Sequence, residues 1–197
     1  MFEKIKVMNG FILYTGEQGS GKTAMAVRSV FVERGKRPIF SNCKLFKDHD
    51  ANILLDYTPI AFDVSKASNK GKLDILATLD ENPNFFNDSI MLLDECHLYL
   101  DSLDFMRKNN RKLQTFFSQL RKRHILLLGT AQSLWNVDIR CRRQCLNVIQ
   151  MEHSKGSLFL AETDKLSKDG NWAEFVSKYA FDLKPYYNKF DTDEVQE

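Results

Sequence analysis

The sequence has little of what marks secreted, membrane-spanning or strongly basic proteins. Among its 197 residues are only four cysteines and no C-x-x-C pair. We therefore expect neither a disulfide framework nor a zinc site, and we expect the cysteines to be the reduced thiols of a cytosolic protein. No run approaches the ~20 apolar residues of a membrane span, and the N-terminus lacks the apolar segment of a signal peptide. Because the formal net charge is only +2, any contact with DNA has to come from a local basic patch.

The length and the 43% hydrophobic content suit one well-packed α/β domain and not two sizeable ones. We therefore expect residues 1–197 to form a single domain. The acidic end of the chain, residues 185–197, is expected to form an extended tail.

A glycine-rich run between residues 16 and 23 fits the phosphate-binding pattern G-x-x-x-x-G-K-[ST] at every fixed position. It follows a short apolar run at 11–14 that predicts a buried strand, and it precedes a predicted helix at 24–32. A helix N-terminus with flexible glycines before it binds phosphate oxygens through its free N–H groups. We expect the nucleotide to be bound by Gly16, Glu17, Gln18, Gly19, Ser20, Gly21, Lys22 and Thr23.

The end of this loop predicts how a nucleotide and its metal are held. Lys22 is expected to reach the β- and γ-phosphates, and the Thr23 hydroxyl to bind Mg²⁺. The guanine-reading sequence Asn-Lys-x-Asp does not occur, since residues 69–72 fail at the last position. ATP with Mg²⁺ is therefore the expected ligand.

A second signal is the apolar run at 89–93, which ends in Asp94 and Glu95. Such a run is typical of a central parallel strand buried on both faces, and ligands gather at the carboxyl ends of these strands. We expect Asp94 to hold Mg²⁺ through a water and Glu95 to orient or deprotonate the attacking water. The alternative for Glu95 is a solvated carboxylate at a strand end.

Another buried strand is predicted at 124–131 and ends in Gln132, which should lie near Glu95 and sense the γ-phosphate. The alternative is an amide that caps the next turn. Arg140 and Arg143 follow, and two roles compete for them: a finger that reaches the active site of a neighbouring subunit, or a contact to DNA phosphates. Ordinary solvated surface is the third interpretation.

The remaining pattern alternates strands with helices and predicts a mostly parallel sheet with helices on both faces and a C-terminal hairpin. The basic helix at 107–123 should bury Leu113, Phe116, Phe117 and Leu120. The other predicted strands are 38–42, 59–64, 146–151 and 157–162, and the other predicted helices are 73–79 and 172–179.

With the phosphate loop, Asp94-Glu95 and Gln132 in place, the chain resembles the FtsK–HerA superfamily of DNA-pumping ATPases, whose P-loop domain is RecA/FtsK-like. Further shared elements are the strand ending 40–42, the arginine-rich 119–124 segment and the 138–140 segment. Two branches are similar. One packages the genomes of membrane-containing icosahedral viruses, and the other contains the zonula occludens toxin-like ATPases of filamentous phages.

Two features lead us to expect the packaging branch: the 187–194 segment resembles its aromatic-Asp-Thr-x-Glu tail, and the chain lacks the membrane span and second domain usual in the toxin-like branch. The resemblance implies a homo-oligomeric ring that hydrolyses ATP to move double-stranded DNA into a procapsid. A capsid or membrane-vertex protein would be its partner, in the cytoplasm of an infected cell or on the virion. The alternatives are filamentous phage assembly and export, or a slow nucleotide-dependent scaffold.

Overall fold

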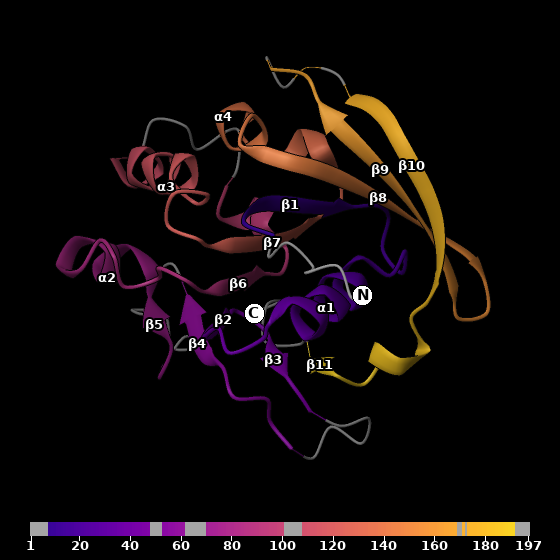
Figure 1. The fold of residues 1–197 in the computed structure, drawn as a ribbon, viewed down its shortest axis with the longest axis horizontal. Coiled ribbons are helices and arrows are strands. Elements are labelled where there is room, and N and C mark those ends of the chain that lie inside the picture. The colour runs from indigo at the N-terminus through magenta and orange to yellow at the C-terminus, as the bar shows by residue number, and fades with distance from the viewer. Residues whose placement is uncertain are drawn as a thin grey trace, which may run out of the picture.

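The computed structural model describes residues 8–47, 53–61, 70–100, 108–168, 171 and 173–191. Within them runs a nine-stranded sheet of order β10-β9-β8-β1-β7-β6-β2-β4-β5, with helices on both of its faces (Figure 1). Its strands are β1 (Gly10–Thr15), β2 (Ile39–Ser41), β4 (Thr58–Ala61), β5 (Leu73–Asp74), β6 (Ile90–Leu93), β7 (Leu126–Ala131), β8 (Cys145–Lys155), β9 (Leu158–Leu166) and β10 (Ala173–Asp182). The α-helices are α1 (Lys22–Glu33), α2 (Ile75–Glu81), α3 (Lys108–Ser118) and α4 (Ile139–Arg142).

The strands from β8 to β5 pair in parallel, whereas β9 and β10 add to β8 in antiparallel fashion. This is the predicted α/β fold, with a mostly parallel sheet and a C-terminal antiparallel hairpin. A separate pair joins β3 (Lys44–Leu45) to β11 (Phe190–Asp191).

The central strands are apolar on both faces because both faces are covered. In β1, Phe11 and Leu13 pack with α2 and α3, while Ile12 and Tyr14 pack with α1. Successive side chains of a strand point to opposite faces, so one apolar run supplies two cores. The predicted stripe of the basic helix is confirmed, since Leu113, Phe116, Phe117 and Leu120 are all buried; α3 itself ends at Ser118, and Leu120 follows in a turn.

The parallel pairing brings three chain segments to one edge of the sheet. Thr15 at the end of β1 lies opposite Ala131 of β7, and Leu93 of β6 lies opposite Gly129. The loop after β1, the carboxylates after β6 and the glutamine after β7 therefore leave the sheet side by side.

The C-terminal hairpin is longer than the sequence predicts, and the helix predicted at 172–179 is wrong. Residues 173–182 form β10, which pairs with β9. A bulge between Phe175 and Ser177 interrupts the alternation of the strand and leaves Phe175, Val176 and Tyr179 at a spacing that imitates a helical stripe. Residue 172 lies outside the described residues.

Other predicted segments are described in part. Of the strand expected at 59–64, residues 59–61 belong to β4, and 62–64 lie outside the described residues. Of the tail expected at 185–197, residues 185–191 are described; they include part of a 3-10 helix (Lys184–Tyr186) and β11. Residues 192–197 lie outside the described part, as does the start of the helix expected at 107.

The four cysteines are free, as expected. Burial raises the pKa of the Cys43 thiol, and it raises the pKa of Cys141 to about 12. Such thiols stay protonated and react slowly. No helix in the described part of the chain is long and apolar enough to cross a lipid bilayer.

The stack between α3 and the sheet gives a test of the fold. The rings of Phe117 and Phe11 lie 5.9 Å apart at an interplanar angle of 14°. We expect Phe117→Ala to lower the free energy of unfolding in urea by about 3–5 kcal/mol, because it opens a cavity in the core. The control is Phe175→Ala, which removes a ring that is 59% exposed and should change the same quantity by less than about 0.5 kcal/mol. Equal effects of the two substitutions would contradict this packing.

Candidate functional site

The phosphate loop lies between β1 and α1, as the sequence predicts. Its last two residues, Lys22 and Thr23, are already the first residues of α1. No side chain caps the start of the helix, where Gly21 adopts a left-handed conformation with φ 82°. The first N–H groups of α1 therefore remain available for phosphate oxygens.

At two positions of the loop, both the neighbouring atoms and the backbone angles leave room only for glycine. A Cβ atom on Gly16 would collide with the backbone oxygen of Met151, and one on Gly21 would lie 2.7 Å from a ring carbon of Phe159. Both glycines also have positive φ angles, which L side chains adopt at a cost. The β8–β9 hairpin thus packs directly against the loop.

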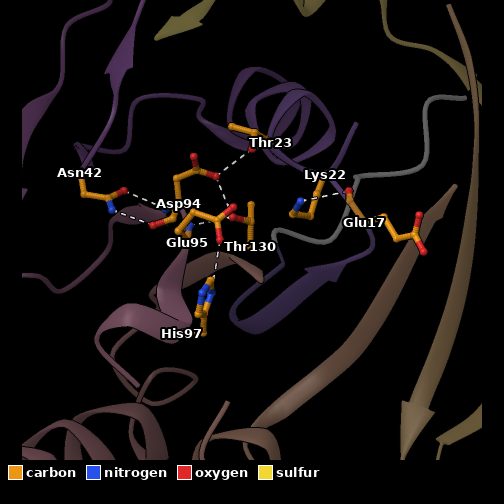
Figure 2. A network of polar contacts seen from close by, with 8 residues as sticks. All are labelled: Glu17, Lys22, Thr23, Asn42, Asp94, Glu95, His97 and Thr130. Carbon is orange, nitrogen blue, oxygen red and sulfur yellow. Dashed lines mark hydrogen bonds and ion pairs between the residues drawn. The ribbon is translucent and has the colours of Figure 1, made fainter. Parts of the chain in front are cut away.

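Lys22 and Ser20 point to a ligand of this loop. Lys22 is a buried residue, and its ammonium group donates a hydrogen bond of 3.2 Å to the backbone oxygen of Glu17 (Figure 2). The buried hydroxyl oxygen of Ser20 has no hydrogen-bond partner among the described residues. A phosphate in the loop would supply acceptors for both groups.

Asp94 lies at the centre of a network that joins four elements (Figure 2). Its Oδ1 accepts hydrogen bonds from Thr23 of α1 at 2.8 Å and from Thr130 of β7 at 2.7 Å. Its backbone N–H donates to Asn42 Oδ1 at 2.7 Å, and its carbonyl accepts from Asn42 Nδ2 at 2.8 Å. The carboxylate after β6 is therefore fixed from the loop helix, from β7 and from the end of β2.

Glu95 is held in an unusual backbone conformation beside this network. Its φ of 49° and ψ of 45° are left-handed, which costs a non-glycine residue roughly 1–2 kcal/mol. The Glu95 N–H donates to the Thr130 hydroxyl at 2.8 Å, and that contact helps to hold the strained residue. Strain of this kind is often found at functional sites.

The Glu95 side chain reaches toward His97, which no sequence pattern had singled out. Glu95 Oε2 lies 3.2 Å from His97 Nδ1. The pair is close enough for an ion pair but poorly aligned for a hydrogen bond, and neither atom hydrogen-bonds to another described residue. His97 is therefore the nearest basic side chain recorded beside the Glu95 carboxylate among the described residues.

Burial dominates the electrostatics of both carboxyl groups. It raises the pKa of Asp94, although hydrogen bonds from Thr130 and Thr23 and the charge of Lys22 act in the opposite direction. It also raises the pKa of Glu95, with the neighbouring Asp94 as the next cause, while Lys22 and His97 oppose the shift. A carboxylate with a raised pKa is a stronger base.

The loop, the carboxylates and Gln132 line a single cavity of about 910 Å³. Gln132 lies at the end of β7, and its backbone oxygen accepts a hydrogen bond from the Gly16 N–H at 3.3 Å. The structure thus brings Lys22, Thr23, Asp94, Glu95 and Gln132 to one cavity.

Arg140 and Arg143 are not among the residues that line this cavity. Arg140 forms an ion pair with Asp138 of its own helix cap, with 2.8 Å between Nη2 and Oδ2. Arg143 is exposed at the end of α4.

Sequence reasoning gave no role to Asn42 and Thr130, which hydrogen-bond to Asp94 and Glu95, or to His97, which lies beside Glu95. Asn42 and Thr130 could have been found by the rule that identified Asp94, because each lies at or near the carboxyl end of a central strand. His97 lies in a short 3-10 helix (Cys96–Leu98). Its role depends on the turn at Glu95, which no local pattern predicts.

The reciprocal pair between Asn42 and Asp94 can be tested by stability. We expect Asn42→Ala to lower the free energy of unfolding by about 2–4 kcal/mol, since it leaves a buried N–H and a buried carbonyl of Asp94 unpaired. Urea denaturation measures this loss. The matched control is Asn136→Ala at an exposed position, which should stay within about 0.5 kcal/mol of the wild type. A loss at Asn42 no larger than at Asn136 would show that the pair does not hold Asp94.

Comparison with solved structures shows related folds at low sequence identity. The N-terminal domain of zonular occludens toxin from Neisseria meningitidis is 22% identical, with a TM-score of 0.64, over 93% of this chain and 100% of that one. The flagellar accessory protein FlaH from Methanocaldococcus jannaschii is 16% identical, with a TM-score of 0.56, over 91% and 87% of the two chains. The genome packaging NTPase B204 from Sulfolobus turreted icosahedral virus 2, in complex with ATP-gammaS, is 10% identical, with a TM-score of 0.50, over 86% and 97%.

Among curated proteins, none matches this chain significantly. A family model does match, over residues 11–159, and it describes the Zonular occludens toxin (Zot) family. The match includes the phosphate loop, Asp94, Glu95 and Gln132, and it corrects the expectation that the packaging branch is the closer one. The chain therefore belongs to the Zot family and has the fold of its P-loop ATPase domains.

Proposed function

We propose that this chain is an ATP-hydrolysing motor that serves the assembly and export of a filamentous phage. The observation that carries the hydrolytic part is the cavity in which Lys22, Thr23, Asp94, Glu95 and Gln132 meet. The family match carries the phage part. Free thiols suit a reducing compartment, and we place the activity in the cytoplasm of the infected cell.

The residues present fit a nucleotide with Mg²⁺. The uncapped start of α1 and the unpartnered Ser20 hydroxyl suit phosphate oxygens, and the paired oxygens of Thr23 and Asp94 suit a hard cation. Thr23 and Asp94 would hold the Mg²⁺, which would supply positive charge against the phosphate oxygens.

The side chains divide the hydrolysis between them. Lys22 exchanges its bond to the Glu17 carbonyl for the β- and γ-phosphates. Glu95 orients a water for attack on the γ-phosphorus and accepts its proton as the bond to the β–γ bridging oxygen breaks. The raised pKa of Glu95 suits it to that task. Gln132 lines the same cavity, and its proposed role is to contact the γ-phosphate or the attacking water.

Assembly into a homo-oligomeric ring would complete the site. Arg140 and Arg143 do not line their own cavity, so we propose that one of them serves a neighbouring subunit or contacts DNA phosphates. If Arg140 is the finger, it has to exchange its bond with Asp138 for the phosphate.

Filamentous phage assembly is here preferred to genome packaging, which is the reverse of the expectation from the sequence. The phosphate loop, the two carboxylates and Gln132 occur in both branches and cannot separate them. The similarity of 187–194 to the packaging branch is a short match, and 192–194 lie outside the described residues. The family model, in contrast, matches residues 11–159 and favours filamentous phage assembly over packaging of double-stranded DNA.

Hydrolysis is tested by two substitutions in the cavity. We expect Glu95→Gln to keep ATP binding and to lower turnover by roughly 10²–10⁴-fold, because the amide cannot accept the proton of water. Lys22→Ala should lose ATP binding as well, since it removes the charge at the phosphates. Release of phosphate and calorimetric titration with ATP measure the two properties.

Matched controls for these variants lie on exposed strand positions. Glu174→Gln and Lys165→Ala change the same side chains far along the hairpin and should leave both properties unchanged. Wild-type turnover in Glu95→Gln would refute the role of Glu95. Undiminished ATP binding in Lys22→Ala would refute that of Lys22.

The biological role is tested by DNA. A motor of filamentous phage export should be stimulated several-fold more by single-stranded than by double-stranded DNA, and its mass by light scattering should be a multiple of 22.9 kDa. Stimulation by double-stranded DNA alone would instead support packaging. A monomer with slow hydrolysis and no response to either DNA would support the scaffold alternative.

A further inference from the structure

The nucleotide cavity has a second wall that the chemistry of phosphates does not use. It is formed by aromatic rings from the C-terminal part of the chain: His153 of β8, Phe159 of β9, and Tyr187 and Phe190 of the segment after β10. Lys22, Asp94 and Gln132 line the same cavity. One cavity thus has a polar wall, which suits phosphates, and an aromatic wall, which suits an apolar part of a ligand.

Phe159 connects the two walls. Its side chain is 4% exposed and lies against Gly21 of the phosphate loop. Its ring meets that of Tyr187 edge to face, with centroids 6.2 Å apart and an interplanar angle of 89°. The centroid of the His153 ring lies 4.9 Å from that of the Phe159 ring. Phe159 therefore contacts both the phosphate loop and the other rings of the aromatic wall.

Tyr187 differs from Phe159 because it remains open to the cavity. It is 39% exposed, and an edge-to-face pair does not cover both faces of both rings. An aromatic face that lines a phosphate-binding cavity, and that no described aromatic ring stacks on in parallel, suits the flat π-surface of a nucleobase.

The segment that carries Tyr187 is held on both sides. On one side, the Leu183 N–H donates to the Ser157 oxygen at 3.1 Å. On the other, Phe190 pairs with Leu45 in the β11–β3 ladder. The Tyr186 ring packs on Phe31 of α1, with centroids 6.2 Å apart. Tyr187 is thus positioned before any ligand binds, which lowers the entropic cost of stacking.

We propose that Tyr187, supported by Phe159, is the stacking platform for the base of the bound nucleoside triphosphate. The inference rests on the proposed function, because the phosphate loop fixes the other end of the same ligand. Stacking recognises the face of a base and not its edge. The site should therefore favour purines over pyrimidines, because a purine covers more of the ring.

The experiment separates the base from the phosphates by using two ligands. Calorimetry measures the binding of Mg²⁺ with ATP, and of Mg²⁺ with inorganic tripolyphosphate, to the full chain. We expect Tyr187→Ala to weaken ATP binding by about 5–150-fold, the range that corresponds to loss of one stacked base. Tripolyphosphate binding should stay within about twofold, and Tyr187→Phe should bind both ligands like the wild type.

Two further variants keep the test decisive. Tyr187→Leu keeps an apolar side chain without a π-face and should weaken ATP binding as Ala does, even if the Ala variant is unstable. Tyr179→Ala removes an exposed tyrosine of β10 that does not line the cavity, and it should change neither ligand.

The outcomes are distinguishable from failure of the proposed function. If Tyr187→Leu binds ATP like the wild type, or if Tyr187→Ala weakens both ligands equally, the base platform is refuted. Wild-type binding of tripolyphosphate without tighter binding of ATP would also refute it. If the wild type binds neither ligand, the nucleotide-dependent function itself is wrong.

Discussion

The structure depends on the burial of one carboxylate at the meeting point of four elements. Asp94 is 2% exposed, and an isolated ionised carboxylate in such a place would be strongly destabilising. Hydroxyl groups from α1 and β7 hydrogen-bond to its side chain, and the amide of Asn42 hydrogen-bonds to its backbone. The same contacts that make the burial tolerable align the phosphate loop with the central strands. Integrity of the core and geometry of the site are therefore not separable in this protein.

Much of this arrangement could be predicted from the sequence, because the strongest patterns are local. The apolar runs before Gly16, Asp94 and Gln132 predict three central strands, and parallel strands place their ends at one edge. What could not be predicted depends on contacts between distant segments. Phe159 and Tyr187 belong to strands and turns with no phosphate-related motif, and only the fold brings them to the loop. The helix predicted at 172–179 was wrong because the bulge in β10 depends on the pairing with β9 and not on local spacing.

The β8–β9 hairpin restricts the conformation of the phosphate loop by packing against it. Met151 and Phe159 approach Gly16 and Gly21 so closely that no side chain fits at either glycine. The glycines of a phosphate loop are usually explained by the approach of the ligand to the backbone. Here the protein imposes the same requirement from the opposite side, so the shape of the loop does not depend on the ligand alone.

Strand order also determines when the site can form during synthesis. The phosphate loop leaves the ribosome early, yet β1 has β7 and β8 as its neighbours, and both are more than a hundred residues away along the chain. Pairings between such distant segments carry a high entropic cost and form late. At roughly 5–20 residues per second, the loop waits several seconds or more for the strands that bracket it. Until then its apolar flanks at β1 and α1 are unpaired, so the nascent chain is most exposed to aggregation while its most recognisable motif is already complete.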